Sequence, residues 1–296
     1  MNLTTEDTEI YTESAEVKIS ALSVFFYLCV LCGKKRPYFC AMLLTDTHTH
    51  QYYETDPVKR VELMQRCADN SINRLFLPNV DLESVQQVFD LTAAYPDICY
   101  PMLGMHPCSV KEGWEEELDA IMNAQGDRKI YAIGEIGIDL YWDKTTLAMQ
   151  VEAFKKQIAI AKSKKLPIVI HCREAFDEVF QVLEEEKDDD LFGILHCFTG
   201  THEQALKAIE LGFYLGIGGV VTYKNGGIDK FLPEIDLKHV VLETDSPYLT
   251  PVPHRGKRNE SSYLIYVAQK LAELYQLPIE KVAEITTENS RQVFGV

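Results

Sequence analysis

The stretch 168–200, IVIHCREAFDEVFQVLEEEKDDDLFGILHCFTG, contains the unit from which most of the chain is built. It begins with the apolar run Ile168–Ile170, continues with apolar residues spaced as on one helix face, and reaches a second apolar run at 192–195. Short runs rich in Ile, Val and Leu, separated by helices, are typical of parallel strands buried on both faces. The stretch therefore predicts a strand–helix–strand unit, with His171 and His196 directly after its two strands.

The same alternation extends from residue 42 to residue 296. The expected strands are 43–46, 72–77, 98–103, 130–133, 168–170, 192–195, 213–217 and 240–242. Helices are expected after Asp56 and Asp81, at 113–123, 147–161 and 176–183, after Thr201, and at 228–232, 262–275 and 278–294. Eight strand–helix units in about 250 residues predict an α/β fold, a (β/α)8 TIM barrel, with a doubly wound open sheet as the alternative.

Histidines and acids follow five of the expected strands, and we expect no charged residue in the middle of a strand. The segment Asp46-Thr47-His48-Thr49-His50 follows the first strand, and its two histidines point to the same side of an extended chain. Glu135, flanked by glycines that permit close backbone approach, follows the fourth strand. The others are His171, His196 and Asp245, after the fifth, sixth and eighth strands. A barrel gathers such residues at one rim, whereas an open sheet would place ligands at a single switch point.

Four histidines and two carboxylates are more ligands than one catalytic zinc with an open position needs. They suit two divalent ions that share a carboxylate. Glu135 is the expected bridge because the fourth strand lies across the barrel from the first and the eighth. Asp245 is expected to hold one ion and to accept the proton of the attacking water. The sequence thus predicts a metal-dependent hydrolase whose catalytic residues are Glu135 and Asp245.

The charge of the chain limits its possible partners. The 296 residues carry a formal net charge of −16, which argues against a broad basic coat for nucleic acid or for a membrane surface. A nucleic-acid substrate stays possible because bound ions supply positive charge locally. The one dense basic segment is His254-Arg255-Gly256-Lys257-Arg258-Asn259, where an arginine beside metal ions would suit phosphate oxygens.

The first 41 residues differ from the rest, and we expect two regions, 1–41 and 42–296. Residues 21–32 are almost entirely apolar, but a bilayer span needs about 20 residues, and the flanks do not fit a signal peptide. Met42 directly precedes the first expected strand, so translation is expected to start there, and residues 1–41 receive no function. The single Cys29–Cys32 pair does not favour a zinc or redox site. Eight cysteines in a chain of this length predict a reducing compartment, the cytoplasm.

Seven ordered motifs resemble those of the TatD family of metal-dependent deoxyribonucleases. They are DTHTH at 46–50, GMHP at 104–107, GEIGID at 134–139, IVIHCR at 168–173, HCFTG at 196–200, ETDSPYL at 243–249 and PHRGKRN at 253–259. The resemblance covers 42–296. It departs from the family pattern at Ser261, where the family usually has proline.

The resemblance implies a TIM barrel that hydrolyses phosphodiester bonds in DNA, single-stranded or at frayed ends, with two divalent ions such as Zn, Mn or Mg. It implies one ion among His48, His50, Glu135 and Asp245, and the other among Glu135, His171 and His196. The expected substrate contacts are His106, Arg173, Arg255 and Lys257.

Two other functions compete with the nuclease. An amidohydrolase-type enzyme would act on a small amide, lactone or phosphoester, and many such enzymes bridge their ions with a carboxylated lysine after the fourth strand. This chain has Glu135 at that place, which favours the nuclease. A binding protein on the same scaffold would have lost ligands, and the sequence retains all six.

Overall fold

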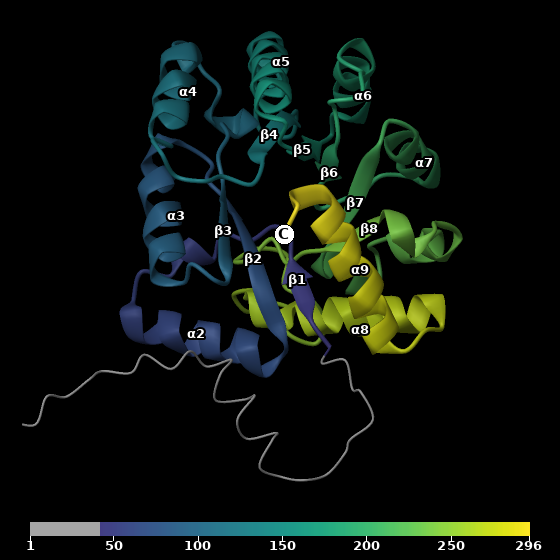
Figure 1. The fold of residues 1–296 in the computed structure, drawn as a ribbon. Helices are drawn as coiled ribbons and strands as arrows, with labels where there is room; N and C mark the ends of the chain where they lie inside the picture. Colours follow the sequence, from purple (N-terminus) through teal and green to yellow (C-terminus); the bar gives the residue numbers. More distant parts are fainter. Residues whose placement is uncertain (1–41) are drawn as a thin grey trace, which may run out of the picture. The chain divides into compact units, whose positions relative to one another are not determined.

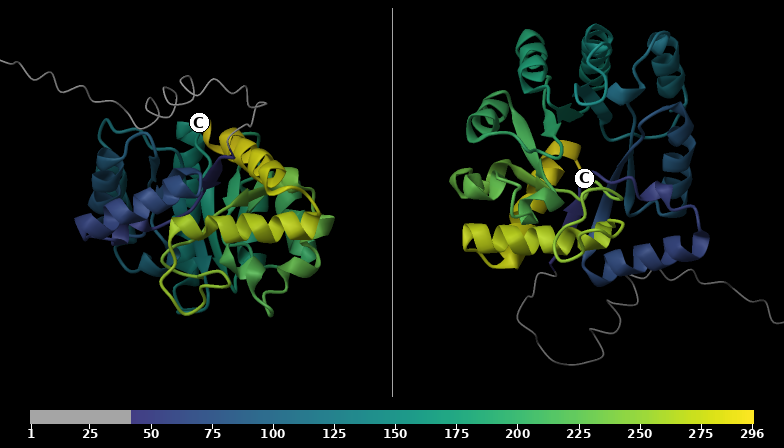
Figure 2. Two further views of the ribbon diagram at one scale, coloured as in Figure 1. Left: turned by 90° about the horizontal axis from the view of Figure 1, so that it is seen from below. Right: turned by 180° about the vertical axis from the view of Figure 1, so that it is seen from behind.

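The computed structural model describes residues 42–296, and the predictions made for residues 1–41 lie outside the described residues. Figure 1 shows parallel strands arranged in a ring with helices on the outside, and Figure 2 shows the same arrangement from below and behind. The strands are β1 (Leu44–Asp46), β2 (Ile72–Pro78), β3 (Cys99–Met102), β4 (Ile133–Asp139), β5 (Ile168–Arg173), β6 (Gly193–Leu195), β7 (Phe213–Ile217) and β8 (Val240–Leu242).

A helix follows each of the strands β1 to β6, as predicted, and two helices follow β8. They are α2 (Pro57–Asp69), α3 (Leu82–Ala94), α4 (Trp114–Asn123), α5 (Leu147–Lys164), α6 (Phe176–Glu185), α7 (His202–Glu210), α8 (Leu264–Tyr275) and α9 (Ile279–Phe294). Asp56, Asp81 and Thr201 cap α2, α3 and α7 through side-chain oxygens that accept backbone N–H groups. None of the helices in residues 42–296 is both long and apolar enough to cross a membrane.

Backbone hydrogen bonds close the strands into a barrel. Regular parallel pairing links the consecutive strands β1, β2 and β3 in one sheet, and the consecutive strands from β4 through β8 in another. Between β3 and β4, the Gly134 N–H donates to the Leu103 carbonyl over 2.9 Å. Between β8 and β1, the Thr47 N–H donates to the Leu242 carbonyl over 3.0 Å. These bonds confirm the predicted barrel and exclude the open sheet.

The barrel interior is filled by its own apolar cluster, separate from the larger one between strands and helices. Ile168 and Ile170 belong to the larger cluster, so Val169 between them faces the barrel axis. The end of α9 closes the interior, and the Phe294 ring stacks on Phe76 with centroids 3.7 Å apart. The members of the inner cluster are Phe76, Met102, Ala132, Val169, Ile194, Val241, Val293 and Phe294.

The fourth strand lies further along the chain than predicted. It was expected at 130–133, but β4 covers Ile133–Asp139, so Glu135 lies inside the strand rather than after it. The prediction that no strand carries a charged residue in its middle is therefore wrong, and Arg74 in β2 is a second exception. Pairing with β5 skips Glu135, and this irregularity redirects its side chain. Residues 134–139 were not predicted as a strand because glycines disfavour strands. Position 137 requires a glycine, since a φ of +134° suits glycine alone.

The helix expected at 228–232 is also absent. Two 3-10 turns, Ile228–Lys230 and Leu232–Glu234, stand in its place. Only five residues separate Gly227, which has a φ of +82°, from Pro233, which lacks the N–H that an α-helix needs. The segment between Gly227 and Pro233 is therefore too short for a full helix.

Candidate metal centre

The alternation of the strands places the candidate ligands at one end of the barrel. Inner-face residues recur at every second position of a strand. In β5, Val169 belongs to the apolar interior and His171 is the next residue on that face. Ile194 in β6 and the following His196 have the same relation. The centre is therefore a polar layer directly above the apolar interior.

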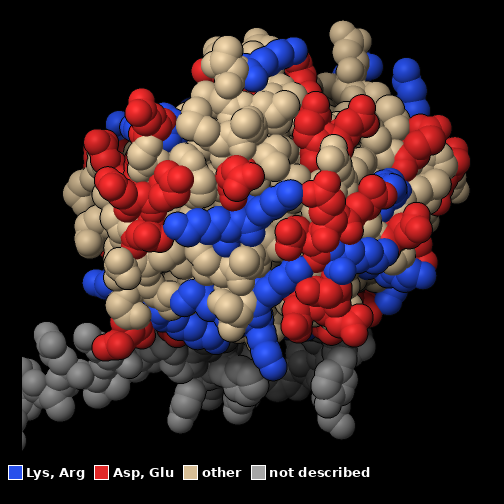
Figure 3. Space-filling view, turned by 90° about the horizontal axis from the view of Figure 1, so that it is seen from above, with Lys and Arg blue, Asp and Glu red and all other residues tan. Residues whose placement is uncertain are grey.

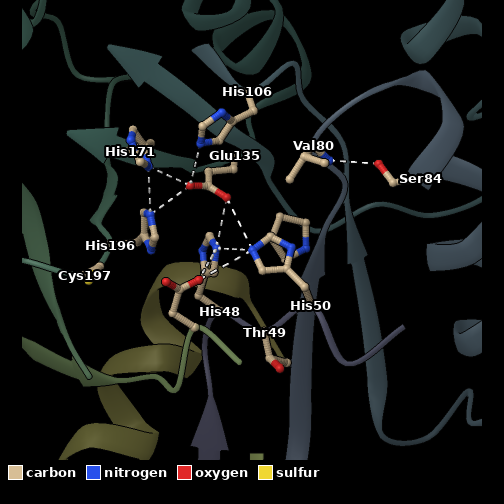
Figure 4. A network of polar contacts seen from close by, with 12 residues as sticks. His48, Thr49, His50, Val80, Ser84, His106, Glu135, His171, His196 and Cys197 are labelled. Atoms are coloured by element: carbon tan, nitrogen blue, oxygen red, sulfur yellow. Dashed lines mark hydrogen bonds and ion pairs between the residues drawn. The ribbon is translucent and has the colours of Figure 1, made fainter. Parts of the chain in front are cut away.

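Glu135 lies in the middle of this layer, and its two oxygens face different histidines (Figure 4). Oε1 is 2.9 Å from His171 Nδ1 and 2.9 Å from His196 Nε2. Oε2 is 3.2 Å from His48 Nε2 and 3.6 Å from His50 Nε2. This carboxylate thus joins two separate pairs of imidazoles, which is the arrangement a bridging ligand requires.

Asp245 completes the first group of ligand atoms. Its Oδ1 lies 3.5 Å from His50 Nε2 and 3.8 Å from His48 Nε2, and these two nitrogens are 3.3 Å apart. Ligand atoms about 2.1 Å from a common ion stand roughly 3 to 3.5 Å from each other. The separations therefore fit a divalent ion held by His48, His50, Glu135 and Asp245.

The second group consists of Glu135, His171 and His196. His171 Nδ1 and His196 Nε2 are 3.5 Å apart, and each is 2.9 Å from Glu135 Oε1. Two nitrogens and one oxygen converging at this spacing fit a second divalent ion. The structure thus brings together all six predicted ligands, and their division between two ions stays a prediction, since His48, His196 and Asp245 also lie close enough to share an ion.

A tyrosine fixes the proton of His50. The Tyr52 hydroxyl donates to the Pro78 carbonyl over 2.8 Å, so its oxygen can only accept the contact of 2.9 Å from His50 Nδ1. His50 Nδ1 therefore carries the proton of the neutral ring, and Nε2 presents a lone pair to the centre. Such partners of ligating histidines set the tautomer and the ring orientation.

Asp139 does the same for His171. Its Oδ2 accepts from His171 Nε2 over 2.8 Å, and its Oδ1 accepts the N–H groups of Tyr141 and Trp142 over 2.9 and 3.3 Å. Burial opposes the charge of Asp139, but these bonds, His171 first, lower its pKa to about 2. The ionised carboxylate can only accept, so the proton of neutral His171 is on Nε2 and the lone pair of Nδ1 faces Glu135.

Asp46 connects the ends of β1 and β8. Its carboxylate accepts from the Thr244 N–H over 2.9 Å and from the Thr244 hydroxyl over 2.6 Å. Complete burial raises the pKa of Asp46 to about 7, although these bonds lower it. The Asp245 N–H also donates to the His48 carbonyl over 2.9 Å. The backbones that carry His48 and Asp245 are therefore held at a fixed separation.

His106 touches the centre as a hydrogen-bond donor. Its Nδ1 accepts the Cys108 N–H over 3.1 Å, so the proton of the neutral ring is on Nε2. That nitrogen lies 3.3 Å from Glu135 Oε1. Although His106 lies close enough to Glu135 and His171 to count among possible ligands, its tautomer suits donation to an oxygen instead.

The electrostatics of the centre favour the ionised form of its central acid. Burial alone would raise the pKa of Glu135, but the surrounding histidines, His196 first, outweigh it and hold this pKa well below the usual range. Burial likewise opposes the charge of His196, yet Glu135 and Glu243 raise its pKa well above the usual value. Protons and divalent ions therefore compete for the same lone pairs.

The predicted basic contacts lie around the centre rather than in it. Arg173, the last residue of β5, places its guanidinium 3.6 Å from the centroid of the Tyr141 ring. Arg255 lies over the Tyr223 ring at 3.8 Å. No described contact links the side chain of Lys257 to the centre; its backbone carbonyl accepts from Thr250.

Glu260 and Ser261 hold the basic loop in place where the chain departs from the family pattern. Glu260 accepts both ends of the Arg66 guanidinium from α2, over 2.7 and 2.8 Å. The Ser261 hydroxyl donates to Thr49 Oγ1 over 3.0 Å. A cavity of about 380 Å³ opens beside His50 between α2 and this loop. The loop thus borders both the ligands and an open space.

The sequence reasoning missed three side chains that position ligands. They are Tyr52, Asp139 and Glu243, whose Oε1 lies 3.5 Å from His196 Nδ1 and accepts the Cys197 N–H over 2.6 Å. Each was visible as a polar residue in or beside a motif: Tyr52 two residues after DTHTH, Asp139 at the end of GEIGID and Glu243 at the start of ETDSPYL. Their roles depend on which ring nitrogen they contact, and only the structure gives that.

Removal of the Tyr52 hydroxyl tests whether the partners of the histidines affect ion binding. Tyr52→Phe leaves His50 Nδ1 without its acceptor, so divalent-ion affinity is expected to fall about 10- to 100-fold, as measured by calorimetric titration. Tyr275→Phe is the matched control, because it deletes another hydroxyl that donates to backbone carbonyls, those of Leu232 and Ile235, away from the centre. Equal ion affinities in the two variants would contradict the role of Tyr52.

Fold and site together define a metal-dependent hydrolase built on a TIM barrel. The family model of TatD-related DNases matches residues 45–295, so the chain belongs to that family. A metal-dependent hydrolase of Bacillus subtilis, YabD, is 40% identical over 258 residues, which cover 86% of this chain and all of that protein. The 3'-5' ssDNA/RNA exonuclease TatD of Edwardsiella piscicida is 30% identical over 79% of this chain and 92% of its own length. The crystal structure of the TatD homologue YJJV from Escherichia coli superposes with a TM-score of 0.80, at 26% identity, over 86% of this chain and 98% of that one.

Proposed function

We propose that this protein is a nuclease that hydrolyses phosphodiester bonds of single-stranded DNA with two divalent ions. The observation that carries the proposal is the position of Glu135, whose two oxygens face two separate pairs of histidines. Divalent ions at such a site lower the pKa of a water and polarise a phosphoryl oxygen. Zinc and manganese suit the imidazole nitrogens, while magnesium prefers oxygen ligands.

The residues of the chain have distinct roles in this reaction. Asp245, whose side chain is 14% exposed while that of His48 is fully buried, lies on the open side of the centre and accepts the proton of the attacking water. His106 donates its Nε2 proton to a substrate oxygen beside Glu135. Arg173 and Arg255 offer guanidinium groups to phosphate oxygens at the rim.

The choice of substrate is supported by relatives and by charge. Relatives at about 30% identity carry the name of a 3'-5' ssDNA/RNA exonuclease. The face over α4, α5 and α6, at the top of Figure 1, carries acidic and basic side chains interspersed (Figure 3). Such a face does not offer the continuous positive field that duplex-coating proteins use. A short single strand, held at one phosphate by the centre and the nearby arginines, needs no such field. The unpaired thiols of Cys67 and Cys99 support the cytoplasm as the place of action.

A substrate screen tests the proposed function. Metal-free protein is supplied with Mg²⁺, Mn²⁺ or Zn²⁺ and offered labelled single-stranded DNA, duplex DNA, RNA, a lactone and a small amide. We expect cleavage of the single-stranded DNA with at least one ion, faster than cleavage of the duplex, and loss of cleavage when a chelator is added. Turnover of the lactone or the amide without any cleavage of DNA would refute the nuclease and favour a small-molecule hydrolase.

A further inference from the structure

Two aromatic side chains stand exposed on the loop after β4. Trp142 is 72% exposed, the highest value for a large apolar side chain in residues 42–296, and its neighbour Tyr141 is 48% exposed. Their rings meet edge to face, with centroids 4.9 Å apart and an interplanar angle of 87°. Exposing a tryptophan to this extent sacrifices the free energy that burial would provide. A surface of this kind marks a place where a ligand supplies the missing contact.

This loop is tied to the metal centre by a single carboxylate. Asp139 Oδ1 accepts the N–H groups of Tyr141 and Trp142, while Asp139 Oδ2 accepts from the ligand candidate His171. The base of the aromatic pair is therefore only one side chain away from the centre, and the same carboxylate that orients His171 also holds the loop.

Arg173 connects the aromatic pair to the mouth of the barrel. His171 and Arg173 are two residues apart in β5, so they share the inner face, and Arg173 lies roughly 7 Å further toward solvent. Its guanidinium covers the Tyr141 ring at 3.6 Å and lies 5.7 Å from the centroid of Trp142. One face of Tyr141 is thus occupied, whereas Trp142 and the outer face of the guanidinium are open to a planar ligand.

We propose that Trp142, with Arg173 packed on Tyr141, is a stacking platform for a nucleobase next to the phosphodiester bond that is cut. This rests on the proposed nuclease function and adds where a base is held. Aromatic rings and arginine planes stack on any base, which gives grip on a single strand without sequence preference. In a duplex the bases are already paired and stacked, so the platform favours single strands and frayed ends. The positive charge of Arg173 beside the ring suits the adjacent phosphate.

Tryptophan fluorescence provides a readout that does not depend on catalysis. The chain has two tryptophans, and Trp114 is buried at 6% exposure. In the Asp245→Asn variant, which is expected to cut far more slowly than the wild type, a short oligodeoxyadenylate is expected to quench the exposed Trp142. A Trp142→Phe change in the same background leaves only Trp114, and the quenching is expected to disappear. Quenching that persists without Trp142 would overturn the platform.

Affinity and kinetics give the second test. Trp142→Ala is expected to weaken oligodeoxyadenylate binding and raise KM about 10-fold, with kcat nearly unchanged, because stacking acts on bound substrate and transition state alike. Removing the base beside the cut bond, by an abasic site in the oligonucleotide, should weaken binding to the wild type about as much as Trp142→Ala does. The abasic site should not weaken binding to the Trp142→Ala variant any further. Tyr214→Ala is the matched control, because it removes a half-buried tyrosine near the start of β7, at the end of the strand away from the metal centre. It should change neither KM nor kcat.

The outcomes separate the two proposals. A wild-type protein that neither binds nor cuts the oligonucleotide with any divalent ion would overturn both the nuclease and the platform. A wild-type protein that cuts the oligonucleotide, while Trp142→Ala binds and cuts it equally well, would overturn the platform alone.

Discussion

Asp245→Asn is expected to lower kcat for single-stranded DNA by about a hundred- to ten-thousandfold while the protein stays folded. The amide keeps the shape of the side chain but cannot accept the proton of the attacking water, and general-base catalysis contributes about this factor. The backbone should accept the change, because Asp245 has a φ of +53°, a left-handed conformation that asparagine also tolerates. Steady-state kinetics with saturating divalent ion measure the loss, and thermal unfolding checks the fold.

Asp236→Asn is the matched control for this prediction. It makes the same chemical change before β8, at the end of that strand opposite the centre, where Asp236 accepts the Lys238 N–H. We expect this variant to retain full activity. If Asp245→Asn cut the strand at the wild-type rate, the role of Asp245 as proton acceptor would be wrong.

The barrel could be predicted from the sequence because its strands are buried on both faces. Such strands appear as short apolar runs, and 168–170 and 213–217 show how well these runs locate them. The prediction failed at β4, where Gly134, Glu135 and Gly137 interrupt the apolar pattern. The irregular strand that carries the candidate ligand Glu135 needs those interruptions. A prediction based on apolar runs therefore misses this strand.

The meeting of the six candidate ligands could also be predicted, because parallel strands carry their carboxyl ends to one rim whatever their distance in sequence. What could not be predicted is the protonation pattern of the histidines. This pattern depends on which ring nitrogen a neighbouring side chain contacts, as Tyr52 contacts His50 Nδ1 and Asp139 contacts His171 Nε2. The sequence does not give the orientation of a ring. The aromatic pair beside Arg173 was likewise invisible, because nothing in the letters Tyr-Trp shows that both rings lie outside the core.

Glu135→Gln is expected to lower kcat by about a thousandfold or more. Each tenfold loss corresponds to about 1.4 kcal/mol, and a metal-assisted centre contributes several kcal/mol to the transition state. The glutamine keeps one oxygen but turns an NH₂ group toward the ring nitrogens of either His171 and His196 or His48 and His50. A donor at that place excludes a cation, so the change damages one ion site directly and weakens the shared bridge. Kinetics on the same DNA measure the loss.

The stoichiometry of bound ions distinguishes this variant from Asp245→Asn. The ion-pair contacts of Asp245 are with His48 and His50, so its replacement leaves Glu135, His171 and His196 in place and should retain one tightly bound ion per chain. Glu135 contacts both groups, so Glu135→Gln should hold less than one tight ion, as elemental analysis after dialysis measures. A Glu135→Gln protein with the same ion content as the wild type would show that the two groups fill independently. Glu135 would then be one ligand among several, and the two-ion centre organised around it would have to be abandoned.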